Sequence, residues 1–425
     1  MHHRGSSMTS SLHSLLRKII AKGALRLTDH TGQVEMLGDG SGPPVAIRFT
    51  DADAQEAIAN DPALKLGEMY MEGRMLLEEG DIYDFLALVK ANTRSEALTW
   101  KMIGLGLARM AAAQISMRLP VNHNRRNVAH HYDLSAKLFA LFLDEDWQYS
   151  CAYFNPPGIS LVGAQAAKKR HIAAKLLLEP AMKVLEIGSG WGGMAMYLAE
   201  AAGVDVTGIT LSQEQLRVSQ GRAGKRGLAG GVRFLLQDYR YLPPQKYDRI
   251  VSVGMFEHVG IGSYGTFFGK VADVLADDGV MLLHAIGRPK PSYATNPFIE
   301  KYIFPGGYIP SLGEVLPAIE KADLLVRDVE VLPLHYAYTL RHWRQRFVAR
   351  KEEVLAIYDE RFFRMWEFYL AGSEMAFTHE DLFIFQIQIA KSQFTVPDNR
   401  DYITAAEEKY RAFEANRPPL EPVEF

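Results

Sequence analysis

The sequence predicts an α/β protein, with a doubly wound sheet in the larger C-terminal part of the chain and a small α+β domain before it. Two observations support this prediction. Beyond residue 183, apolar runs of strand length alternate with stretches of helical periodicity. The first of these strands, Lys183–Ile187, runs directly into a cluster of four glycines, as a tight strand-to-helix turn requires.

The composition is that of an ordinary globular protein. Hydrophobic residues make up 48% and charged residues 23% of the 425 residues, and the formal net charge is -3, which gives no bulk signature of nucleic-acid binding. No apolar run approaches the ~18 residues of a membrane span, and the first residues lack the apolar centre of a signal peptide. The single cysteine excludes an intrachain disulfide and indicates a reducing compartment.

The first 115 residues predict the α+β domain. Apolar residues recur at helical spacing from Leu12 to Ile20, which predicts an amphipathic helix docked on its own domain or, as the less favoured alternative, lying on a lipid surface. Strands are expected at residues 23–28 and 45–49, and helices at residues 52–77 and 82–91. We interpret four acidic residues here as a solvated face: Glu68, Glu72, Glu78 and Glu79.

A change in composition marks the domain boundary. A Met-, Ala- and Gly-rich helix is expected over residues 98–119, ending before Pro120. The polar segment that follows, residues 121–127, indicates a linker. We divide the chain into an N-terminal domain at residues 1–115, a linker at residues 116–127 and a second domain at residues 128–425.

The second domain carries the alternating elements. Helices between its early strands are expected at residues 193–202, 213–226 and 264–276. Right-handed crossovers place the carboxyl ends of parallel strands on one rim of the sheet, so residues at strand ends are the first candidates for a site. The expected strands are residues 183–188, 204–210, 232–237, 247–254, 280–286, 324–332 and 382–394.

The glycine loop at residues 188–193 satisfies two patterns. It fits the G-x-G-x-x-G fingerprint of dinucleotide-binding folds and the E-x-G-x-G loop of S-adenosylmethionine (SAM) methyltransferases. Glu186, two residues before the first glycine, would repel a pyrophosphate and attract a cationic ligand. The next strand has no terminal acid to hold an NAD ribose. These features favour SAM over a dinucleotide and over a turn without a ligand.

Polar residues at the next strand ends could complete the pocket. Thr210, Ser212 and Gln215 offer hydroxyls and an amide where a ribose-binding acid usually stands. Asp238 could accept a hydrogen bond from an adenine amine, with Tyr239 near the ring, or it could simply cap the strand.

Further candidates for chemistry lie on the same rim. Glu257 and His258 close the fourth strand, and His284 ends the fifth. A buried histidine needs a partner, and we expect Glu257 to be the partner of His284. Cys151 has no histidine close in sequence to activate a thiolate, which favours a lining role over a nucleophile. No metal-ligand spacing such as H-E-x-x-H occurs among these residues, so no metal site is expected.

Six stretches, taken in order, resemble the motifs of the cyclopropane-fatty-acyl-phospholipid synthases and the related mycolic acid cyclopropane synthases. The resemblance covers residues 128–395 and implies a Rossmann-like class I SAM methyltransferase sheet with a helical acyl-binding insertion. Residues 289–298 do not match the family pattern. The six stretches are YSCAY from Tyr149, VLEIGSGWG from Val184, GITLSQEQ from Gly208, QDYR from Gln237, MFEHVG from Met255 and FPGGYIPS from Phe304.

The resemblance implies methyl transfer from SAM to a cis double bond, after which the resulting carbocation loses a proton to bound bicarbonate as a cyclopropane ring closes. The residues implied for SAM are Tyr149, Ser150, Glu186, Gly188, Gly190, Thr210, Leu211, Gln215, Asp238 and Tyr239. The catalytic residues implied for the bicarbonate pocket are Cys151, Glu257, His284, Ile286 and Tyr336.

The N-terminal domain resembles the lipid-docking domain of the phospholipid enzymes. The implied substrate is a membrane phospholipid with an unsaturated acyl chain, and the implied location is the cytoplasm, in peripheral contact with the inner face of the membrane. Aromatic residues between His335 and Phe377 are expected mostly in the core, with a few along an acyl tunnel. Two alternatives stay open: a sister methyltransferase that leaves a methylene or methyl branch, and a non-catalytic lipid-binding protein, which the intact glycine loop disfavours. A homodimer also stays open.

Overall fold

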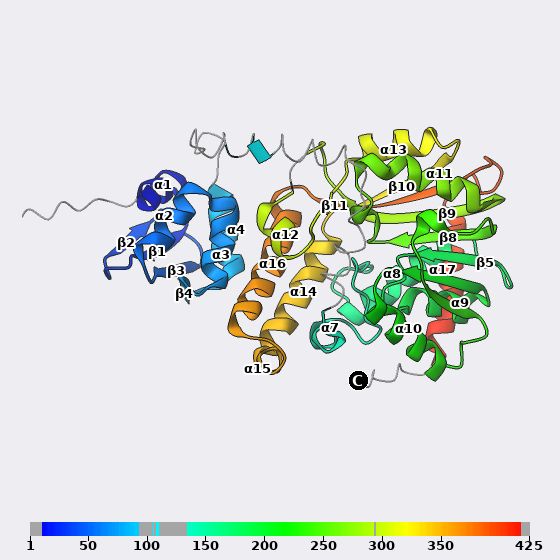
Figure 1. Ribbon diagram of the computed structural model, residues 1–425, viewed down its shortest axis with the longest axis horizontal. Coiled ribbons are helices and arrows are strands. Elements are labelled where there is room, and N and C mark those ends of the chain that lie inside the picture. The colour runs from blue at the N-terminus through cyan, green and yellow to red at the C-terminus, as the bar shows by residue number, and fades with distance from the viewer. Residues whose placement is uncertain (1–10, 93–104, 106–107, 110–133, 293–294, 418–425) are drawn as a thin grey trace, which may run out of the picture.

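The computed structural model describes residues 11–92, 105, 108–109, 134–292 and 295–417 (Figure 1). The linker expected at residues 116–127 lies outside the described residues, and so does most of the helix expected at residues 98–119. Among the helices described, none is both long and apolar enough to cross a membrane.

A four-stranded sheet and helices form the N-terminal unit. The strands lie in the order β2-β1-β3-β4. Leu12 and Leu16 of the first helix are buried in one cluster with Leu25 and Ile47 of the sheet, so this helix docks on its own unit, as favoured from the sequence. The elements are α1 (Ser11–Ile19), β1 (Ala24–Thr28), β2 (Val34–Leu37), β3 (Pro44–Phe49), α2 (Ala52–Asn60), α3 (Pro62–Met71), β4 (Met75–Glu79) and α4 (Ile82–Asn92).

Two expectations for this unit are wrong. The single helix expected over residues 52–77 is the pair α2 and α3, divided at Asp61, and its last residues belong to β4, which pairs antiparallel with β3. Glu68 is not on a solvated face. It is 3% exposed and accepts hydrogen bonds from Lys65, Lys301 and Tyr302 at 2.6–2.8 Å. The periodicity of α3 could not reveal these partners, because two of them lie in the second domain.

The second domain contains a seven-stranded sheet in the order β10-β11-β9-β8-β5-β6-β7, which confirms the doubly wound α/β fold. The pairs among β5 to β9 are parallel, and β11 runs antiparallel to both of its neighbours. The last strand ends earlier than expected, at Ala390. The strands are β5 (Lys183–Ile187), β6 (Asp205–Thr210), β7 (Val232–Leu236), β8 (Tyr247–Val253), β9 (Leu275–Gly287), β10 (Leu325–Leu332) and β11 (Phe383–Ala390).

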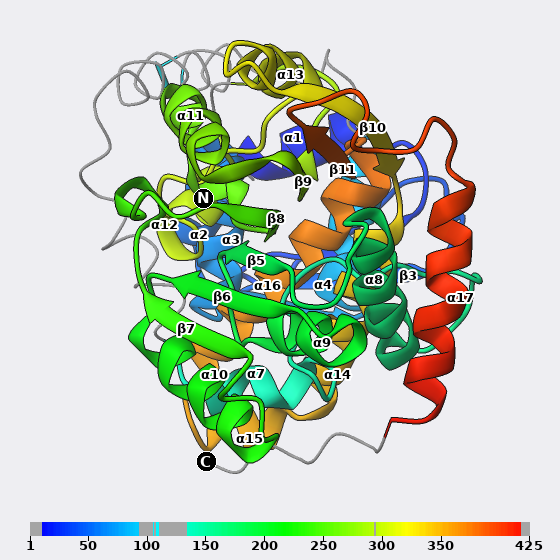
Figure 2. The same ribbon diagram turned by 90° about the vertical axis from the view of Figure 1, so that its right-hand side faces the viewer.

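Helices cover both faces of this sheet (Figure 2). Successive residues of β5 point to opposite faces: Val184 packs with Met194 of α9 and Ile403 of α17, whereas Leu185 packs with Phe267 of α11. The helices and short 3-10 turns are α7 (Ala136–Phe142), α8 (Leu161–Lys175), α9 (Gly193–Ala202), α10 (Gln213–Lys225), η2 (Tyr239–Tyr241), η3 (Phe256–His258), η4 (Ile261–Ser263), α11 (Tyr264–Val274), α12 (Pro297–Tyr302), α13 (Leu312–Glu320) and α17 (Asp401–Ala415).

A helical insertion separates β10 from β11. It consists of α14 (His335–Ala349), α15 (Lys351–Leu355) and α16 (Glu360–His379), and it lies between the N-terminal unit and the large sheet (Figure 1). Phe368 of α16 and Phe298 of α12 are buried in the same hydrophobic cluster as the N-terminal core. The N-terminal unit is therefore packed directly on the insertion.

Candidate active site

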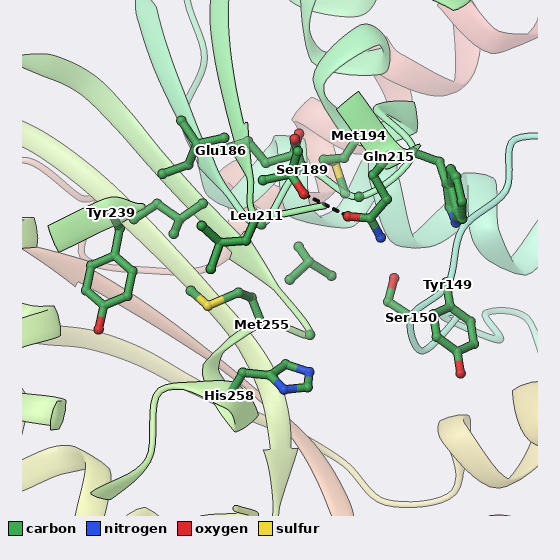
Figure 3. Close-up of a pocket in the computed structure, with 18 of the residues that line it drawn as sticks. Tyr149, Ser150, Glu186, Ser189, Met194, Leu211, Gln215, Tyr239, Met255 and His258 are labelled. Carbon is green, nitrogen blue, oxygen red and sulfur yellow. Dashed lines mark hydrogen bonds between the residues drawn. The ribbon is translucent and has the colours of Figure 1, made fainter. Parts of the chain in front are cut away.

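Two neighbouring cavities lie at the carboxyl ends of the central parallel strands. The first has a volume of about 130 Å³ and lies at the glycine loop after β5. All ten residues that the resemblance implies for SAM line it, and Figure 3 shows several of them around the space. They are Tyr149, Ser150, Glu186, Gly188, Gly190, Thr210, Leu211, Gln215, Asp238 and Tyr239.

The turn from β5 into α9 requires glycine for two different reasons. Gly188 has a φ of +87°, and an added Cβ would lie 2.7 Å from the Cβ of Met255, so both the backbone and the neighbour exclude a side chain. Gly190 has a φ of +52°, but a Cβ there would meet no protein atom within 4 Å. Because Gly190 lines the first cavity, this open space is room for a ligand close to the backbone.

Glu186 brings a buried carboxyl group to the first cavity. It accepts a hydrogen bond from the backbone of Ala195, but its Oε2 has no partner among the described residues. Burial raises the pKa of Glu186 to about 8. A cationic ligand would favour the ionised form and satisfy the second oxygen. This arrangement fits SAM, which carries a sulfonium and an ammonium group.

The end of β6 supplies a fixed amide to the cavity. The hydroxyl of Thr210 donates to Oε1 of Gln215 at 2.8 Å, so the NH2 end of this amide is left for other contacts. Ser212, which the sequence suggested as a further hydroxyl of the pocket, does not line the cavity. Its hydroxyl accepts from the N–H of Gln215 at 3.2 Å and caps α10.

Asp238 caps a turn, one of the two roles that the sequence left open, and it also lies in the cavity wall, where the contact with adenine stays a prediction. It caps η2 by accepting from the N–H of Arg240 at 3.0 Å, and it lines the first cavity beside Tyr239. Its carboxylate also forms an ion pair with the Arg240 guanidinium at 2.6 Å, which fixes its orientation.

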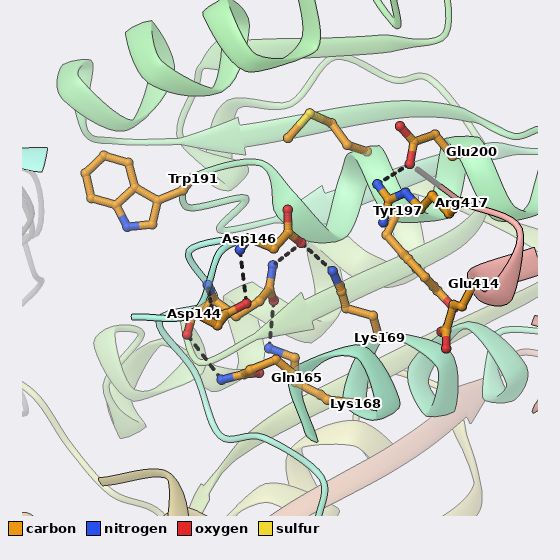
Figure 4. Close-up of polar contacts among 12 residues, drawn as sticks. Asp144, Asp146, Gln165, Lys168, Lys169, Trp191, Tyr197, Glu200, Glu414 and Arg417 are labelled. Atoms are coloured by element: carbon orange, nitrogen blue, oxygen red, sulfur yellow. Dashed lines mark hydrogen bonds and ion pairs between the residues drawn. The ribbon is translucent and has the colours of Figure 1, made fainter. Parts of the chain in front are cut away.

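A buried polar network positions the segment that follows α7 (Figure 4). Lys168 of α8 donates to Oε1 of Gln148 and to Oγ of Ser150, both at 2.7 Å. Asp146 forms an ion pair with Arg222 of α10 at 2.7 Å. Burial lowers the pKa of Lys168 to about 7. Together these contacts hold the backbone that contributes Tyr149 and Ser150 to the cavity.

The second cavity is larger, about 350 Å³, and is lined mainly by apolar and aromatic side chains. Both its size and its lining are typical of a site for an apolar ligand. All five residues implied for the bicarbonate pocket line it. They are Cys151, Glu257, His284, Ile286 and Tyr336.

Glu257 is not the partner of His284, contrary to the expectation from the sequence. Its Oε1 accepts a hydrogen bond from the backbone N–H of Ile286 at 2.6 Å, and its Oε2 has no partner among the described residues. Burial raises the pKa of Glu257 to about 7. Glu257 thus fixes the end of β9 and leaves one oxygen free in the cavity wall.

His284 instead contacts a residue that the sequence analysis missed. Its Nδ1 lies 3.2 Å from Nε2 of Gln386 on β11, and its Nε2 has no partner in the part of the chain that the structure describes. Burial, with cationic residues nearby, lowers the pKa of His284 to about 3, so the ring is neutral. No sequence signal pointed to Gln386, because only the tertiary fold pairs β11 with β9.

Cys151 has the properties of a lining residue. It is buried, and its thiol donates to the carbonyl of Ala152 at 3.2 Å. Burial raises the pKa of the thiol far above its usual range, so the thiolate needed for nucleophilic attack does not form at neutral pH.

The N-terminal unit and the insertion close the second cavity. Leu66 of α3 and Leu86 of α4 line it, which no sequence pattern indicated. The insertion supplies Tyr336, Phe368, Tyr369 and Phe377 to the lining, whereas Trp343, Phe347 and Trp366 are buried in the core, as expected for a stretch with both roles. Thr295 and Asn296, from the stretch that does not match the family pattern, also line the cavity.

The two cavities share four lining residues: Tyr149, Ser150, Gly254 and His258. A ligand in the first cavity would therefore lie beside a ligand in the second. Burial lowers the pKa of His258 to about 4, so this shared wall carries a neutral imidazole.

Comparisons with known proteins place the chain in one family. The family model described as Mycolic acid cyclopropane synthetase matches residues 121–387. The cyclopropane-fatty-acyl-phospholipid synthase of Escherichia coli (strain K12) is 38% identical over 353 residues, covering 82% of this chain and 88% of that protein. The tuberculostearic acid methyltransferase UfaA1 of Mycobacterium tuberculosis is 34% identical over 386 residues, covering 88% of this chain and 89% of that protein.

A solved structure extends the comparison to the fold. The mycolic acid cyclopropane synthase CmaA1 in complex with SAH and CTAB is 36% identical, with a TM-score of 0.59 over 62% of this chain and 97% of that chain. The matched family, the similar relatives and the common fold lead to one conclusion: the chain belongs to the cyclopropane synthase family and is a SAM-dependent methyltransferase.

Proposed function

We propose that this protein transfers a methylene group from SAM to the cis double bond of an unsaturated acyl chain in a membrane phospholipid and so forms a cyclopropane ring. The observation that carries this proposal is the common wall of the two cavities, made by Tyr149, Ser150, Gly254 and His258. When bound, SAM supplies an electrophilic methyl group. The common wall would bring this group next to an acyl chain in the second cavity, where the reaction requires it.

The residues of the first cavity would bind and orient the donor. The carboxylate of Glu186 would pair with a positive group of SAM, and the NH2 of Gln215 and the carboxylate of Asp238 would bind polar groups of the nucleoside. The open space at Gly190 would let the ligand lie against the backbone.

The residues of the second cavity would protect a carbocation on the acyl chain. Apolar walls exclude water that would otherwise trap the cation. Tyr369, Phe304 and Tyr149 also line the cavity, and aromatic rings there would stabilise positive charge. The neutral states of His258 and His284 add no opposing positive charge.

Bicarbonate fits two polar atoms of this cavity that have no partner among the described residues. One atom is Oε2 of Glu257, which can accept a hydrogen bond from the bicarbonate hydroxyl. The other is Nε2 of His284, which can donate to an anionic oxygen when it carries the proton. When bound, bicarbonate would supply the base.

The assignment of bicarbonate as the base is tested by its removal. Turnover should slow when dissolved carbonate is removed and recover when bicarbonate is added. Full turnover without carbonate would contradict this assignment.

A phospholipid substrate is favoured by the N-terminal unit. Leu66 and Leu86 of this unit line the second cavity. The 353-residue match to the phospholipid synthase cannot fit between residue 121 and residue 425, so it includes part of the N-terminal region. We therefore infer that residues 1–115 dock the protein on the inner, cytoplasmic face of a membrane, and that residues 128–425 perform the chemistry.

A second product is supported by one comparison. The relative named tuberculostearic acid methyltransferase matches 88% of this chain, so the same cavities could leave a methyl or methylene branch.

The acyl chains of lipids extracted from a host that expresses the protein test both proposed products against an inactive protein. Mass spectrometry should find acyl chains heavier by one CH2 unit, with NMR signals of a cyclopropane. Unchanged acyl chains, with SAM binding intact, would contradict both products.

A further inference from the structure

The hydrogen-bond role of His284 depends on which ring nitrogen carries the proton. His284 is 2% exposed, and its depressed pKa keeps the ring neutral, so only one nitrogen is an N–H donor. Nε2 has no partner among the described residues, and His284 lines the second cavity, so Nε2 is the ring nitrogen left to bind a ligand there. Its chemistry therefore follows from the contact at the other nitrogen, Nδ1.

Gln386 makes this contact. It lies directly opposite His284 in the β9–β11 ladder and is completely buried. Its Nε2 is 3.2 Å from Nδ1 of His284, and its Oε1 accepts a hydrogen bond from Nζ of Lys175 at 2.9 Å. One amide thus bridges a lysine and the imidazole.

Lys175 determines which way this amide points. The lysine is 1% exposed, lies at the end of α8, and is ion-paired with Glu330. An ammonium group only donates, so the oxygen of Gln386 must face it. The opposite orientation would bring an NH2 group against an ammonium and leave the amide oxygen against Nδ1, unless that nitrogen carried the proton.

We infer that Lys175 and Gln386 are positioning residues that hold His284 as the Nε2–H tautomer, with its single donor directed to the second cavity. The NH2 of Gln386 donates to Nδ1, so Nδ1 holds the lone pair and Nε2 holds the proton. In this form His284 donates to an anion and does not take up a proton at Nε2. The catalytic part of the inference rests on the proposed function, because it makes this N–H the donor to the bicarbonate base.

The state of the ring is measured directly, without the reaction. In protein labelled with ¹⁵N-histidine, long-range proton–nitrogen spectra distinguish protonated from unprotonated ring nitrogens, and the His284→Gln variant identifies the signals of His284. The wild type is expected to carry the proton on Nε2. A proton on Nδ1 in the wild type would overturn the inference.

Gln386→Glu tests whether the amide of Gln386 sets the tautomer of His284, because glutamate has the same shape but no NH2 group. A carboxylate can accept from Lys175 and from Nδ1–H at once, so the proton is expected to move to Nδ1. Turnover should then fall by about 10²-fold, as on loss of one donor to a catalytic anion, while SAM affinity stays unchanged. More bicarbonate should also be needed for half-maximal turnover. An unchanged tautomer in this variant would contradict the role of Gln386.

Gln388→Leu is the matched control. Gln388 lies two residues further along β11, is equally buried, and donates to the backbone carbonyl of Lys175 at 2.6 Å. Its loss also removes a buried amide beside Lys175, but it should leave the proton of His284 on Nε2 and keep turnover far above that of Gln386→Glu.

Among these variants, turnover should be high where Nε2 of His284 carries the proton and low where Nδ1 carries it. Full turnover by Gln386→Glu with the proton on Nδ1 would overturn the catalytic part and leave the tautomer assignment intact. If wild-type protein with bound SAM formed no product from phospholipid vesicles, the proposed function itself would fail, and the spectra would still decide the tautomer.

Discussion

At the scale of single residues, the site is defined by buried polar atoms that lack partners within the described protein. Oε2 of Glu186 is such an atom in the first cavity, and Oε2 of Glu257 and Nε2 of His284 are such atoms in the second. Unsatisfied buried groups are costly and therefore rare. Oε2 of Glu186 can accept from a cationic ligand in the first cavity. In the second, Oε2 of Glu257 can accept and Nε2 of His284 can donate, which fits a ligand that carries both a hydroxyl and an anionic oxygen.

The raised pKa of Glu186 predicts how SAM affinity depends on pH. The free protein binds a proton at Glu186 below pH ~8, and a cationic ligand binds better to the ionised form. Binding therefore releases a proton, and affinity should rise by up to about tenfold per pH unit until pH ~8 and then level off. Calorimetry in buffers of different ionisation enthalpy measures the released proton.

Glu186→Gln is the control for this pH dependence, since it should bind SAM more weakly and with a flat pH profile over the same range. A slope that survives in Glu186→Gln would assign the proton to another group, with Lys168 as the first candidate because its pKa is lowered to about 7.

Gly190→Val should abolish SAM binding while the fold persists, because the side chain would enter open space in the first cavity. Gly227→Val is the matched control. Gly227 also has positive φ, +69°, and no protein atom within 4 Å of an added Cβ, but it lies outside both cavities. The two variants share the backbone strain, so only the first should lose affinity by calorimetry. Equal affinities would show that the space at Gly190 is not used by the ligand.

At the scale of elements, the glycine turn and the strand ends could be predicted from the sequence, because local patterns encode them. The four glycines and the apolar run of β5 predicted the loop of the first cavity, and polar strand ends predicted Thr210, Gln215, Asp238, Glu257 and His284 beside the cavities. Ile286 and Tyr336 were implied only by the family resemblance, and Ser212 caps α10 instead of lining a cavity. The predicted partner of His284, Glu257, was wrong because Gln386 and His284 meet only through strand pairing. The burial of Glu68 was missed because its partners Lys301 and Tyr302 come from α12, which only the tertiary fold brings to α3.

The contribution of α3 and α4 to the second cavity gives a prediction at this scale. Leu66→Trp should fill part of the cavity and lower turnover of long-chain phospholipid severalfold, with unchanged SAM affinity, because Leu66 lines only the second cavity. Leu64→Trp is the control on the same helix, since Leu64 packs against the N-terminal core and lines neither cavity. Equal turnover by both variants would argue against an acyl chain beside α3.

At the scale of the whole molecule, three parts meet at one site. The large sheet supplies the first cavity, the insertion supplies the aromatic wall of the second, and the N-terminal unit closes it. The core of the N-terminal unit continues into α12 and α16 through Phe298 and Phe368. Tyr70 of α3 also donates to Glu367 of α16 at 2.7 Å, so a buried hydrogen bond joins the N-terminal unit to the insertion.

The central claim is that a methyl carbon bound in the first cavity becomes the ring carbon of a cyclopropane on an acyl chain in the second. The most direct test supplies the purified protein with SAM labelled with ¹³C in its methyl group and with vesicles of unsaturated phospholipid. Carbon NMR of the extracted lipid then identifies the new carbon as a ring methylene, an alkene methylene or a methyl group. We predict a ring methylene in wild-type product and no labelled lipid from Gly190→Val. A labelled methyl or alkene carbon without any ring signal would contradict cyclopropane formation.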